Sequence, residues 1–594
     1  MGSIGALTTE SINMNEWSSK TVDQLKEELR SRGMSVSGKK ADLVFRLNEL
    51  SGAEGVVEAE IAEMAHEEAP STNSDRVLLS IRERVRAKFS AYILVLIIIT
   101  GFTGGGLVLG PDLVNWIKGE EDYELIEFDQ NQTRAYAEGL VNLGHPVWGG
   151  RLSGTVEEEN AAQSIKTNFS NSGLPSTIEE FEIPVYYMGN QFDLMICQPG
   201  NIGGLIGGPT PCSAADLNRD ETDFIHTVDY VVQGYSGSVN IPASSNTQVI
   251  DLGIGNESEN WESAANSVGI VWLLDGEGQE PGTESNTVLM KRAQENSLRG
   301  LITINARQNC DDLVSGDCVP YSKSLDITQF DEKPYNIGFV MVSRSVGESI
   351  LEEVVNGAGM LQFQVDVDNQ DEGQIHVVCG IIQGETEELI VIGAHHDTVY
   401  NGQGAIDNTA GTATVQEMAR QIALFESEAG APKMTIYFCT WGGEEGGLWG
   451  SKEWVDKHRE NLAENLRLYI NLDMNHVDAE RNGGVTLQGN SPTDVRHIRG
   501  LVEEFSKTYP ELYQKYGITV RELESVQMPD NSDHAPFVYD IYQDEGEFGL
   551  AMLCYGSGSS EYHTYLDNMD RFNEESLAVS GILYGSLVRH LAWG

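Results

Sequence analysis

Short apolar runs of strand type occur at intervals in the last third of the chain. Three of them cover residues 389–394, 434–440 and 468–472, and each is short and largely apolar. A continuous apolar run of this length is typical of a strand that is buried on both faces of a sheet. The pattern therefore predicts an α/β fold, in which loops at the carboxyl ends of parallel strands converge on one crevice.

The middle of the chain shows a similar alternation of strand and helix patterns. Apolar runs at residues 267–275, 301–305 and 337–343 have the length of strands. Amphipathic stretches at residues 288–300 and 346–355 have the spacing of helices. This order predicts a second, smaller α/β unit ahead of the last third of the chain.

Side chains that bind metal ions are concentrated in the last third, several of them directly after a predicted strand. In chain order they are His395, His396, Asp397, Asp407, Glu444, Glu445, Asp473 and His563. Imidazole and carboxylate groups suit zinc and, less selectively, cobalt or manganese. The set therefore predicts a metal site at this crevice.

The motifs around these residues resemble those of a known enzyme family. GAHHDT, GAIDNTAG, WGGEEGGLWGS, INLDMN, NSDHAPF and EYHTYLDN occur in the order found in two-zinc exopeptidases of the aminopeptidase Y and bacterial leucyl aminopeptidase type. Plasma glutamate carboxypeptidase belongs to the same family. The resemblance spans residues 133–594 and implies a three-layer α/β domain with a mixed sheet and two Zn²⁺ ions per chain, for which Co²⁺ or Mn²⁺ could substitute.

The resemblance also implies a role for each residue. One zinc would be bound by His395 and Asp473, and the other by Glu445 and His563. Asp407 would bridge the two ions. Glu444 would be the general base, and Asp397 would hydrogen-bond the ligand histidine. Tyr562 would polarise the substrate carbonyl. His396 has no implied ligand role, and His534 would lie near the substrate cleft without binding metal.

Each motif alone also fits a structural explanation. An acidic pair such as Glu444 and Glu445 is usually a solvated surface, and Asp473 could cap the end of a strand. The same fold also serves as a receptor ectodomain when its ligands are lost. All five implied ligands and the base are present here, and this favours a working enzyme over a silent receptor.

The expected unit in the middle of the chain resembles a protease-associated domain. In relatives this domain is inserted into the peptidase and shapes access to its cleft. We therefore expect residues 191–365 to form such an insertion between two parts of the peptidase domain, residues 133–190 and 366–594.

A membrane-spanning segment is predicted near the N-terminus. Residues 89–111 carry no charge and, at 1.5 Å per helical residue, can span a hydrocarbon core of about 30 Å. Basic flanks stay on the cytoplasmic side. Four basic residues precede the segment and acidic residues follow it: Arg82, Arg84, Arg86 and Lys88, then Asp112, Glu120, Glu121 and Asp122. The pattern predicts an uncleaved single-pass anchor in the cell membrane, with a cytoplasmic N-terminus and an outward-facing peptidase.

The segment before this anchor has a separate motif. Residues 18–50 contain two short helical patterns joined by GMSVSGKK and resemble an SAP-type helix-extension-helix motif. Relatives of this motif often bind DNA, and Lys39, Lys40 and Arg46 are the positions that could meet phosphates. A protein-docking or stabilising module is the alternative. The expected order is a tail (1–14), the SAP-like motif (15–51), an acidic linker (52–75), the basic flank and membrane helix (76–111) and a stalk (112–132).

Charge and cysteine content complete the picture. The formal net charge is −53, of which residues 121–594 contribute −49, so that this region is unsuited to nucleic acid. Two cysteine pairs in loop sequence, Cys197 with Cys212 and Cys310 with Cys318, are candidates for local disulfides. Three further cysteines in apolar runs are expected to be core thiols: Cys379, Cys439 and Cys554.

The chain is thus expected to be a membrane-anchored zinc exopeptidase acting on peptides, and an aminopeptidase rather than a carboxypeptidase or dipeptidase. An arginine fork suits a terminal carboxylate, and no arginine lies inside a metal motif. A membrane–DNA tether is a further alternative that could coexist with the enzyme. The oligomeric state does not follow from the sequence.

Overall fold

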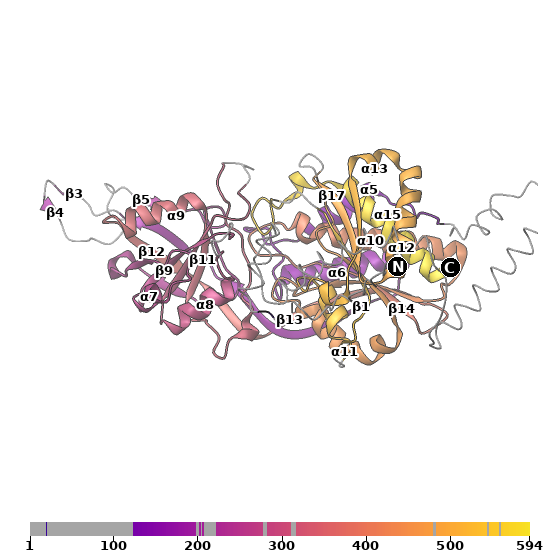
Figure 1. The fold of residues 1–594 in the computed structure, drawn as a ribbon, viewed down its shortest axis with the longest axis horizontal. Coiled ribbons are helices and arrows are strands. Elements are labelled where there is room, and N and C mark those ends of the chain that lie inside the picture. The colour runs from indigo at the N-terminus through magenta and orange to yellow at the C-terminus, as the bar shows by residue number, and fades with distance from the viewer. Residues whose placement is uncertain are drawn as a thin grey trace, which may run out of the picture. The chain divides into compact units, whose positions relative to one another are not determined.

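In the computed structural model, the described helices and strands lie within residues 121–594 (Figure 1). The described residues are Lys20, 123–197, 201–202, 205–206, 221–276, 282–310, 316–478, 483–542, 546–556 and 560–594. The SAP-like motif (except Lys20), the acidic linker and the predicted membrane segment lie outside them. Within the described residues, no helix is both long enough and apolar enough to cross a membrane.

The main domain is built on a mixed sheet of eight strands. In spatial order these are β1 (Ser176–Met188), β13 (Val367–Ile382), β15 (Thr435–Trp441), β14 (Leu389–His395), β16 (Leu466–Leu472), β19 (Ala551–Tyr555), β17 (Gly484–Gly489) and β18 (Gly517–Glu522). The four strands β15, β14, β16 and β19 are parallel. Their carboxyl ends therefore lie along the same edge of the sheet.

Helices cover both faces of this sheet, as expected for a three-layer α/β domain (Figure 1). One face packs against α6 (Val156–Asn171), α10 (Ala410–Ala429), α12 (Pro492–Thr508) and α15 (Glu574–Trp593). The opposite face packs against α11 (Trp449–Asn465) and α14 (His534–Tyr539). Two further helices are α5 (Gln130–Val141), which packs on α10 and α15, and α13 (Pro510–Lys515), which follows α12.

Strand β14 illustrates why its apolar run is continuous. Ile390 and Ile392 face the layer that contains α10, whereas Leu389 and Val391 face the layer that contains α11. Side chains alternate between the two faces of a strand, and here both faces are covered. The strands predicted at 389–394, 434–440 and 468–472 are confirmed to within a few residues.

The insertion forms separate sheets. Its five-stranded sheet has the order β6 (Tyr230–Val232), β11 (Gly338–Val342), β10 (Gly300–Asn305), β9 (Val268–Leu273) and β8 (Val249–Asp251). Its helices are α7 (Ser258–Glu262), α8 (Asn286–Glu295) and α9 (Arg344–Ile350). A second sheet contains β5 (Glu221–Asp223), β2 (Asp193–Cys197), β12 (Met360–Val365) and β7 (Val239–Ile241), and β3 (Asn201–Ile202) pairs with β4 (Leu205–Ile206). The strands and helices predicted for this unit are confirmed.

Two long strands join the insertion to the main domain. β1 and β13 pair from Ser176↔Gly380 to Met188↔Val367, and they carry the chain to and from the inserted sheets. In Figure 1, β13 runs between the inserted sheets and the sheet of the main domain. The sheets of residues 193–365 are thus built between two neighbouring strands of the main sheet.

The disulfides agree with the sequence only in part. Cys310 and Cys318 are bonded as expected, and Cys197 is disulfide-bonded, although its expected partner Cys212 lies outside the described residues. The expectation of free thiols at Cys379 and Cys439 was wrong, since these residues are bonded to each other. They face one another directly in the antiparallel pairing of β13 with β15, which a separation of 60 residues conceals in the sequence. Cys554 is a free, buried thiol.

This arrangement predicts the number of reactive thiols. Among the described cysteines, Cys554 alone should react with maleimide when the chain is made in an oxidising compartment and denatured without reductant, because the other five are bonded. Mass spectrometry of the labelled peptides would identify the site. Labelling of Cys379 and Cys439 as well would contradict the cross-strand bond.

Candidate metal centre

The expected metal ligands converge at the carboxyl edge of the parallel strands. His395 is the last residue of β14, Glu445 follows β15, and Asp473 follows β16. Asp407 lies in the turn Ala405–Thr409 that leads into α10, and His563 lies in the loop after β19. Gly443, with φ +82°, turns the chain between β15 and the two glutamates, a conformation that glycine adopts without strain.

Asp407 occupies the centre of this group. Its Oδ1 lies 3.2 Å from His395 Nε2, and its Oδ2 lies 3.1 Å from His563 Nε2. Asp473 Oδ1 lies 3.4 Å from His395 Nε2, and Glu445 Oε2 lies 3.0 Å from His563 Nε2. The five side chains therefore form two sets of donors that share one carboxylate.

The geometry fits two zinc ions. Ligand atoms about 2.0–2.1 Å from a tetrahedral zinc lie roughly 3.3–3.4 Å from each other, close to the separations found here. An imidazole N–H can serve one acceptor well, yet oxygens of Asp407, Asp473 and Glu444 all approach His395 Nε2. Asp473 Oδ1 and Glu445 Oε1 are buried and have no hydrogen-bond partner among the described residues. Such atoms suit a cation better than a proton, and the residues present fit the metal pair.

The electrostatics of the protein groups alone point the same way. Burial raises the pKa of Glu444 well above its usual value and also raises the pKa of Glu445. Burial lowers the pKa of His563, but the neighbouring Glu445 and Asp407 outweigh it and raise that pKa to about 10. Four acidic groups thus compete for positive charge around two imidazoles, and two divalent ions would neutralise them.

Asp397 has a different contact from the one expected. Its Oδ1 lies 3.6 Å from His395 Nδ1, beyond hydrogen-bonding distance, while its main-chain oxygen lies 3.1 Å from the same nitrogen. The carboxylate instead accepts hydrogen bonds from the main-chain N–H groups of Glu444 and Glu445 and from Ser153 Oγ. Its peptide group therefore orients the histidine, and its carboxylate fixes the loop that carries both glutamates.

The bridging position of Asp407 depends on a second buried carboxylate. Asp567 accepts hydrogen bonds from the main-chain N–H groups of Ile406 and Asp407, at 2.7 and 3.0 Å. The fully buried Arg151 donates to the main-chain oxygens of His396 and Gln403. Arg151 also donates to the Thr409 hydroxyl, so that it holds the whole connection between β14 and α10.

A chain of buried hydrogen bonds fixes Asp473. Ser532 Oγ donates to Asp473 Oδ2 at 2.6 Å and accepts from Asn471 Nδ2 at 2.8 Å. The Tyr469 hydroxyl donates to Asn471 Oδ1, and Trp441 Nε1 donates to that hydroxyl. With one carboxylate oxygen held by Ser532, the other points at His395.

Glu444 and Tyr562 line a cavity of about 330 Å³ beside the ligands. Residues 323–328 of the insertion and the loop from Glu444 to Trp449 form its walls, and Lys323 and Lys452 are among its lining residues. The ring of Tyr562 stacks on that of His563 with centroids 3.7 Å apart. The expected base and the expected carbonyl-polarising residue thus both face a space that could hold substrate.

The other two histidines bind protein groups. His396 Nε2 lies 3.0 Å from Glu158 Oε1, and Glu158 also pairs with His376. His534 is buried, with its Nε2 2.6 Å from the main-chain oxygen of Pro529. His396 therefore pairs with Glu158 and was not expected to bind metal. The contact of His534 with Pro529 closes the segment between them, in which Asp530 and Asn531 line the cavity.

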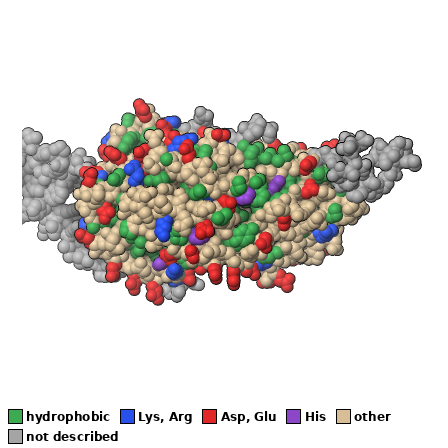
Figure 2. Space-filling model, turned by 180° about the vertical axis from the view of Figure 1, so that it is seen from behind, with side chains coloured by type: hydrophobic (Ala, Val, Ile, Leu, Met, Phe, Trp, Pro, Cys, Tyr) green, Lys and Arg blue, Asp and Glu red, His purple; other side chains and the backbone are tan. Residues whose placement is uncertain are grey.

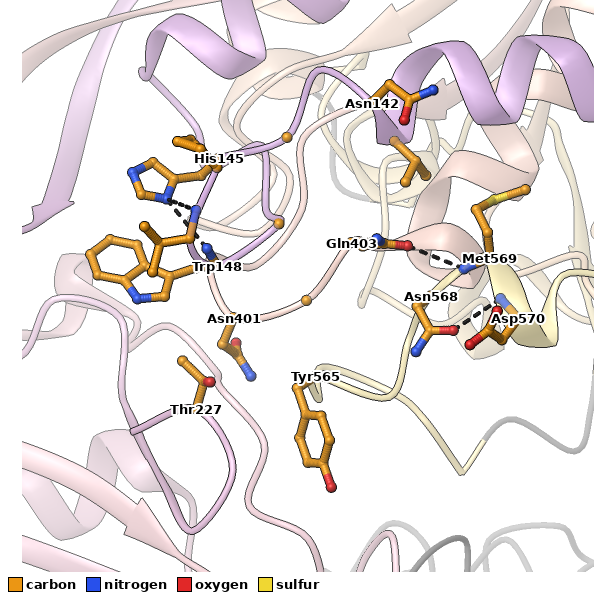
Figure 3. A pocket seen from close by; sticks show the side chains of 16 residues that line it. Asn142, His145, Trp148, Thr227, Asn401, Gln403, Tyr565, Asn568, Met569 and Asp570 are labelled. Atoms are coloured by element: carbon orange, nitrogen blue, oxygen red, sulfur yellow. Dashed lines mark hydrogen bonds between the residues drawn. The ribbon is translucent and has the colours of Figure 1, made fainter. Parts of the chain in front are cut away.

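A larger cavity of about 630 Å³ lies elsewhere (Figure 3). His145 and Trp148, from the loop after α5, line one side of it, and Tyr565 and Asn568 line another. It contains none of the expected metal ligands. Asn401 connects the two regions, since it lines this cavity while its amide donates to the main-chain oxygen of His563.

Several supporting residues escaped the sequence analysis. Ser532 lies inside the motif NSDHAPF and Asp567 inside EYHTYLDN. Their positions close to expected functional residues could have indicated a supporting role. Arg151 and Ser153 precede α6, more than 240 residues before their partners, without a local pattern. No sequence pattern indicated that Ser322 of the insertion contacts His563. The same holds for the positions of Lys323 and Lys452 in the cavity.

Comparisons with known proteins agree with this geometry. Residues 377–587 match the model of peptidase family M28, and residues 16–50 match that of the SAP domain. A probable glutamate carboxypeptidase of Arabidopsis thaliana is 28% identical over 273 residues, which cover 44% of this chain and 37% of that protein. An aminopeptidase of Pseudomonas aeruginosa is 24% identical over 333 residues, which cover 55% and 54%. The chain thus spans about a third to a half of the length of these relatives.

Solved structures share the fold. A zinc aminopeptidase from Bacillus subtilis gives a TM-score of 0.55 at 17% identity and covers 79% of this chain and 96% of that one. An aminopeptidase from Aneurinibacillus gives 0.52 at 17% identity, with 78% and 94% covered. The five residues that converge here all lie within the segment matched by the family model. Over residues 377–587 the chain therefore resembles peptidase family M28.

Proposed function

We propose that this protein is a two-zinc exopeptidase that removes residues from the amino termini of peptides. The observation that carries the proposal is the position of Asp407, whose two oxygens face the two histidines of separate donor sets. A single structural ion would not require a carboxylate shared in this way. The presence of all five donors, together with an acid free to act as base, argues against a silent receptor.

In this proposal the chain holds the metals with five side chains. His395 and Asp473 would hold one ion, Glu445 and His563 would hold the other, and Asp407 would contribute one oxygen to each donor set. When bound, the ions supply Lewis acidity for the scissile carbonyl and lower the pKa of a water molecule. The support from Ser532 and Asp567 keeps the carboxylates in place before substrate arrives.

Glu444 is proposed to carry the proton. Its neighbour Glu445 turns towards His563, whereas Glu444 Oε2 lies 3.9 Å from His395 Nε2 and the residue lines the cavity. Asp397 fixes both main-chain N–H groups, so that the two side chains can diverge. Glu444 would take a proton from the attacking water and deliver it to the leaving amine. Tyr562 would donate a hydrogen bond to the scissile carbonyl oxygen.

Charge supports the choice of the amino terminus. Acidic side chains outnumber basic ones on the face shown in Figure 2, and the cavity contains Asp326 and Asp530 besides the two glutamates. A substrate ammonium therefore meets carboxylates. Arg151 is fully buried and bonded to three protein oxygens, so it cannot bind a substrate carboxylate. The relatives and neighbours described as aminopeptidases support the same choice.

A carboxypeptidase is the second candidate, and one observation favours it. Lys323 and Lys452 both line the cavity and could meet a terminal carboxylate. Lys452 Nζ already donates to the main-chain oxygen of Gly447 at 2.7 Å. The curated relatives described as probable glutamate carboxypeptidases are consistent with this alternative.

The remaining proposals concern location and the other parts of the chain. The charge-free segment 89–111, with basic residues before it and acidic residues after it, supports a membrane anchor with the peptidase outside. The inserted unit has the strand and helix order expected of a protease-associated domain. The match of residues 16–50 to the SAP domain supports a DNA contact on the cytoplasmic side.

Replacement of the base tests the catalytic assignment. Glu444→Gln should lower kcat by about 10²–10⁴-fold or more, because general-base catalysis alone contributes this much. The variant should keep two zinc ions per chain, since Glu444 is not one of the five donors. Elemental analysis and turnover measured on the same preparation check both points.

Asp407→Ala provides the contrasting variant. It should lose zinc as well as activity, because the lost carboxylate contributes to both donor sets. Near-normal turnover of Glu444→Gln with both ions present would reject the base, and full zinc content in Asp407→Ala would reject the bridge.

Blocked substrates test which end of the peptide is bound. The chain should hydrolyse aminoacyl anilides, which lack a terminal carboxylate, and should be inactive on the matched N-acetylated anilides. Acetylation removes the ammonium while leaving the scissile bond unchanged. Efficient release of carboxyl-terminal residues from N-acetylated peptides, with a large rise in KM in Lys323→Met, would establish the carboxypeptidase instead.

Protease digestion tests the proposed topology. On intact cells, added protease should digest the region after Pro111 and spare residues 1–88, because basic flanks stay in the cytoplasm. Antibody tags at both ends would report the fragments. A protected peptidase domain and a digested N-terminus would reverse the orientation.

A further inference from the structure

The insertion contacts a metal ligand of the main domain directly. His563 Nδ1 lies 2.6 Å from the main-chain oxygen of Ser322, and Ser322 N donates to the main-chain oxygen of His563 at 3.1 Å. Ser322 belongs to the inserted unit and is fully buried. A carbonyl oxygen at Nδ1 requires the proton on that nitrogen, so that Nε2, which faces Asp407 and Glu445, is the nitrogen available to a metal ion.

The main domain supplies His563 with a contact of another kind. Asn401 donates to its main-chain oxygen at 3.0 Å, but this bond does not touch the imidazole. His563 has a φ of 58°, which is uncommon for a side chain larger than glycine, so its backbone needs external support. The imidazole itself is oriented by a peptide group of the insertion.

A buried glutamine holds that peptide group in place. Gln233 Nε2 donates to the main-chain oxygen of Tyr321 at 3.0 Å, and Gln233 Oε1 accepts from Lys323 N at 3.1 Å. The Gln233 side chain thus forms hydrogen bonds with the main chain of the residues on both sides of Ser322. Asn286 Nδ2 donates to the same Oε1 at 3.1 Å and fixes the orientation of the amide. Gln233 is fully buried, so water does not compete for these bonds.

A second contact of the insertion reinforces the first. Asn309 Nδ2 donates to the main-chain oxygen of Tyr562, the residue before His563, at 3.0 Å. Val319 N donates to Asn309 O, and the Cys310–Cys318 disulfide closes the loop between them. Two separate points of the inserted unit therefore hold Tyr562 and His563.

We propose that the insertion is part of the metal centre: Gln233, as a positioning residue, fixes the Ser322 peptide that orients His563 and thereby sets the affinity of the Glu445–His563 donor set for zinc. This inference rests on the proposed two-zinc site. The His395–Asp473 set has its own supports, Asp397 and Ser532, from the main domain. Disturbing the Gln233 contact should therefore weaken one zinc and spare the other.

Zinc titration of the full-length apoprotein against a chromophoric chelator tests this. His563→Ala first identifies which of the two binding events belongs to its donor set. Gln233→Met keeps the volume but removes all three hydrogen bonds, and it should weaken that event by about 10–100-fold, as losses of supporting contacts to metal ligands do. Asn309→Gly removes the amide that bonds Tyr562 while glycine adopts the local φ of 53° without strain. It should weaken the same zinc-binding event.

A matched control separates this role from general stability. Gln294→Met removes a glutamine bond to a main-chain oxygen of the same inserted unit, Glu332 O, and should leave both events unchanged. Equal weakening of both zinc sites in Gln233→Met, or no change in either, would overturn the inference. A wild-type chain that binds no zinc pair would overturn the proposed function itself.

Discussion

Buried negative charge around two imidazoles is the constraint on which this structure depends. Asp407, Glu444, Glu445 and Asp473 lie around His395 and His563, and Asp407 and Glu445 are almost inaccessible to solvent. Burial of unpaired carboxylates is strongly unfavourable unless cations or hydrogen bonds compensate. Two metal ions would supply the compensating positive charge, and most neighbouring polar groups keep the carboxylates and imidazoles in position.

Those neighbouring groups come from distant parts of the chain. Ser153 and Arg151 precede α6, Asp567 follows β19, and Ser322 belongs to the insertion. Each supplies or receives a hydrogen bond that fixes a ligand or the loop that carries it. The eight-stranded sheet brings the ligands to one edge, and these contacts determine their orientation. The insertion thus contributes to the site as well as to the walls of the cavity.

The sequence predicted the parts of this arrangement that depend on local pattern. The apolar runs located β14, β15 and β16, because strands covered on both faces need continuous apolar sequence. The motifs then identified all the donors that converge. The pattern did not reveal that Asp397 bonds the glutamate loop, that Cys379 faces Cys439, or that Ser322 orients His563. Those contacts depend on strand register and on backbone groups, and neither leaves a residue-type signature in one sequence.

Zinc content measured together with activity tests the central claim most directly. Full-length chain should be purified, stripped of metal and reloaded with increasing zinc, with bound zinc counted by elemental analysis and peptide hydrolysis measured on the same samples. The account predicts saturation at two ions per chain. It also predicts that peptide hydrolysis appears with the bound zinc. Full activity with no bound metal, or saturation at one ion per chain, would contradict it.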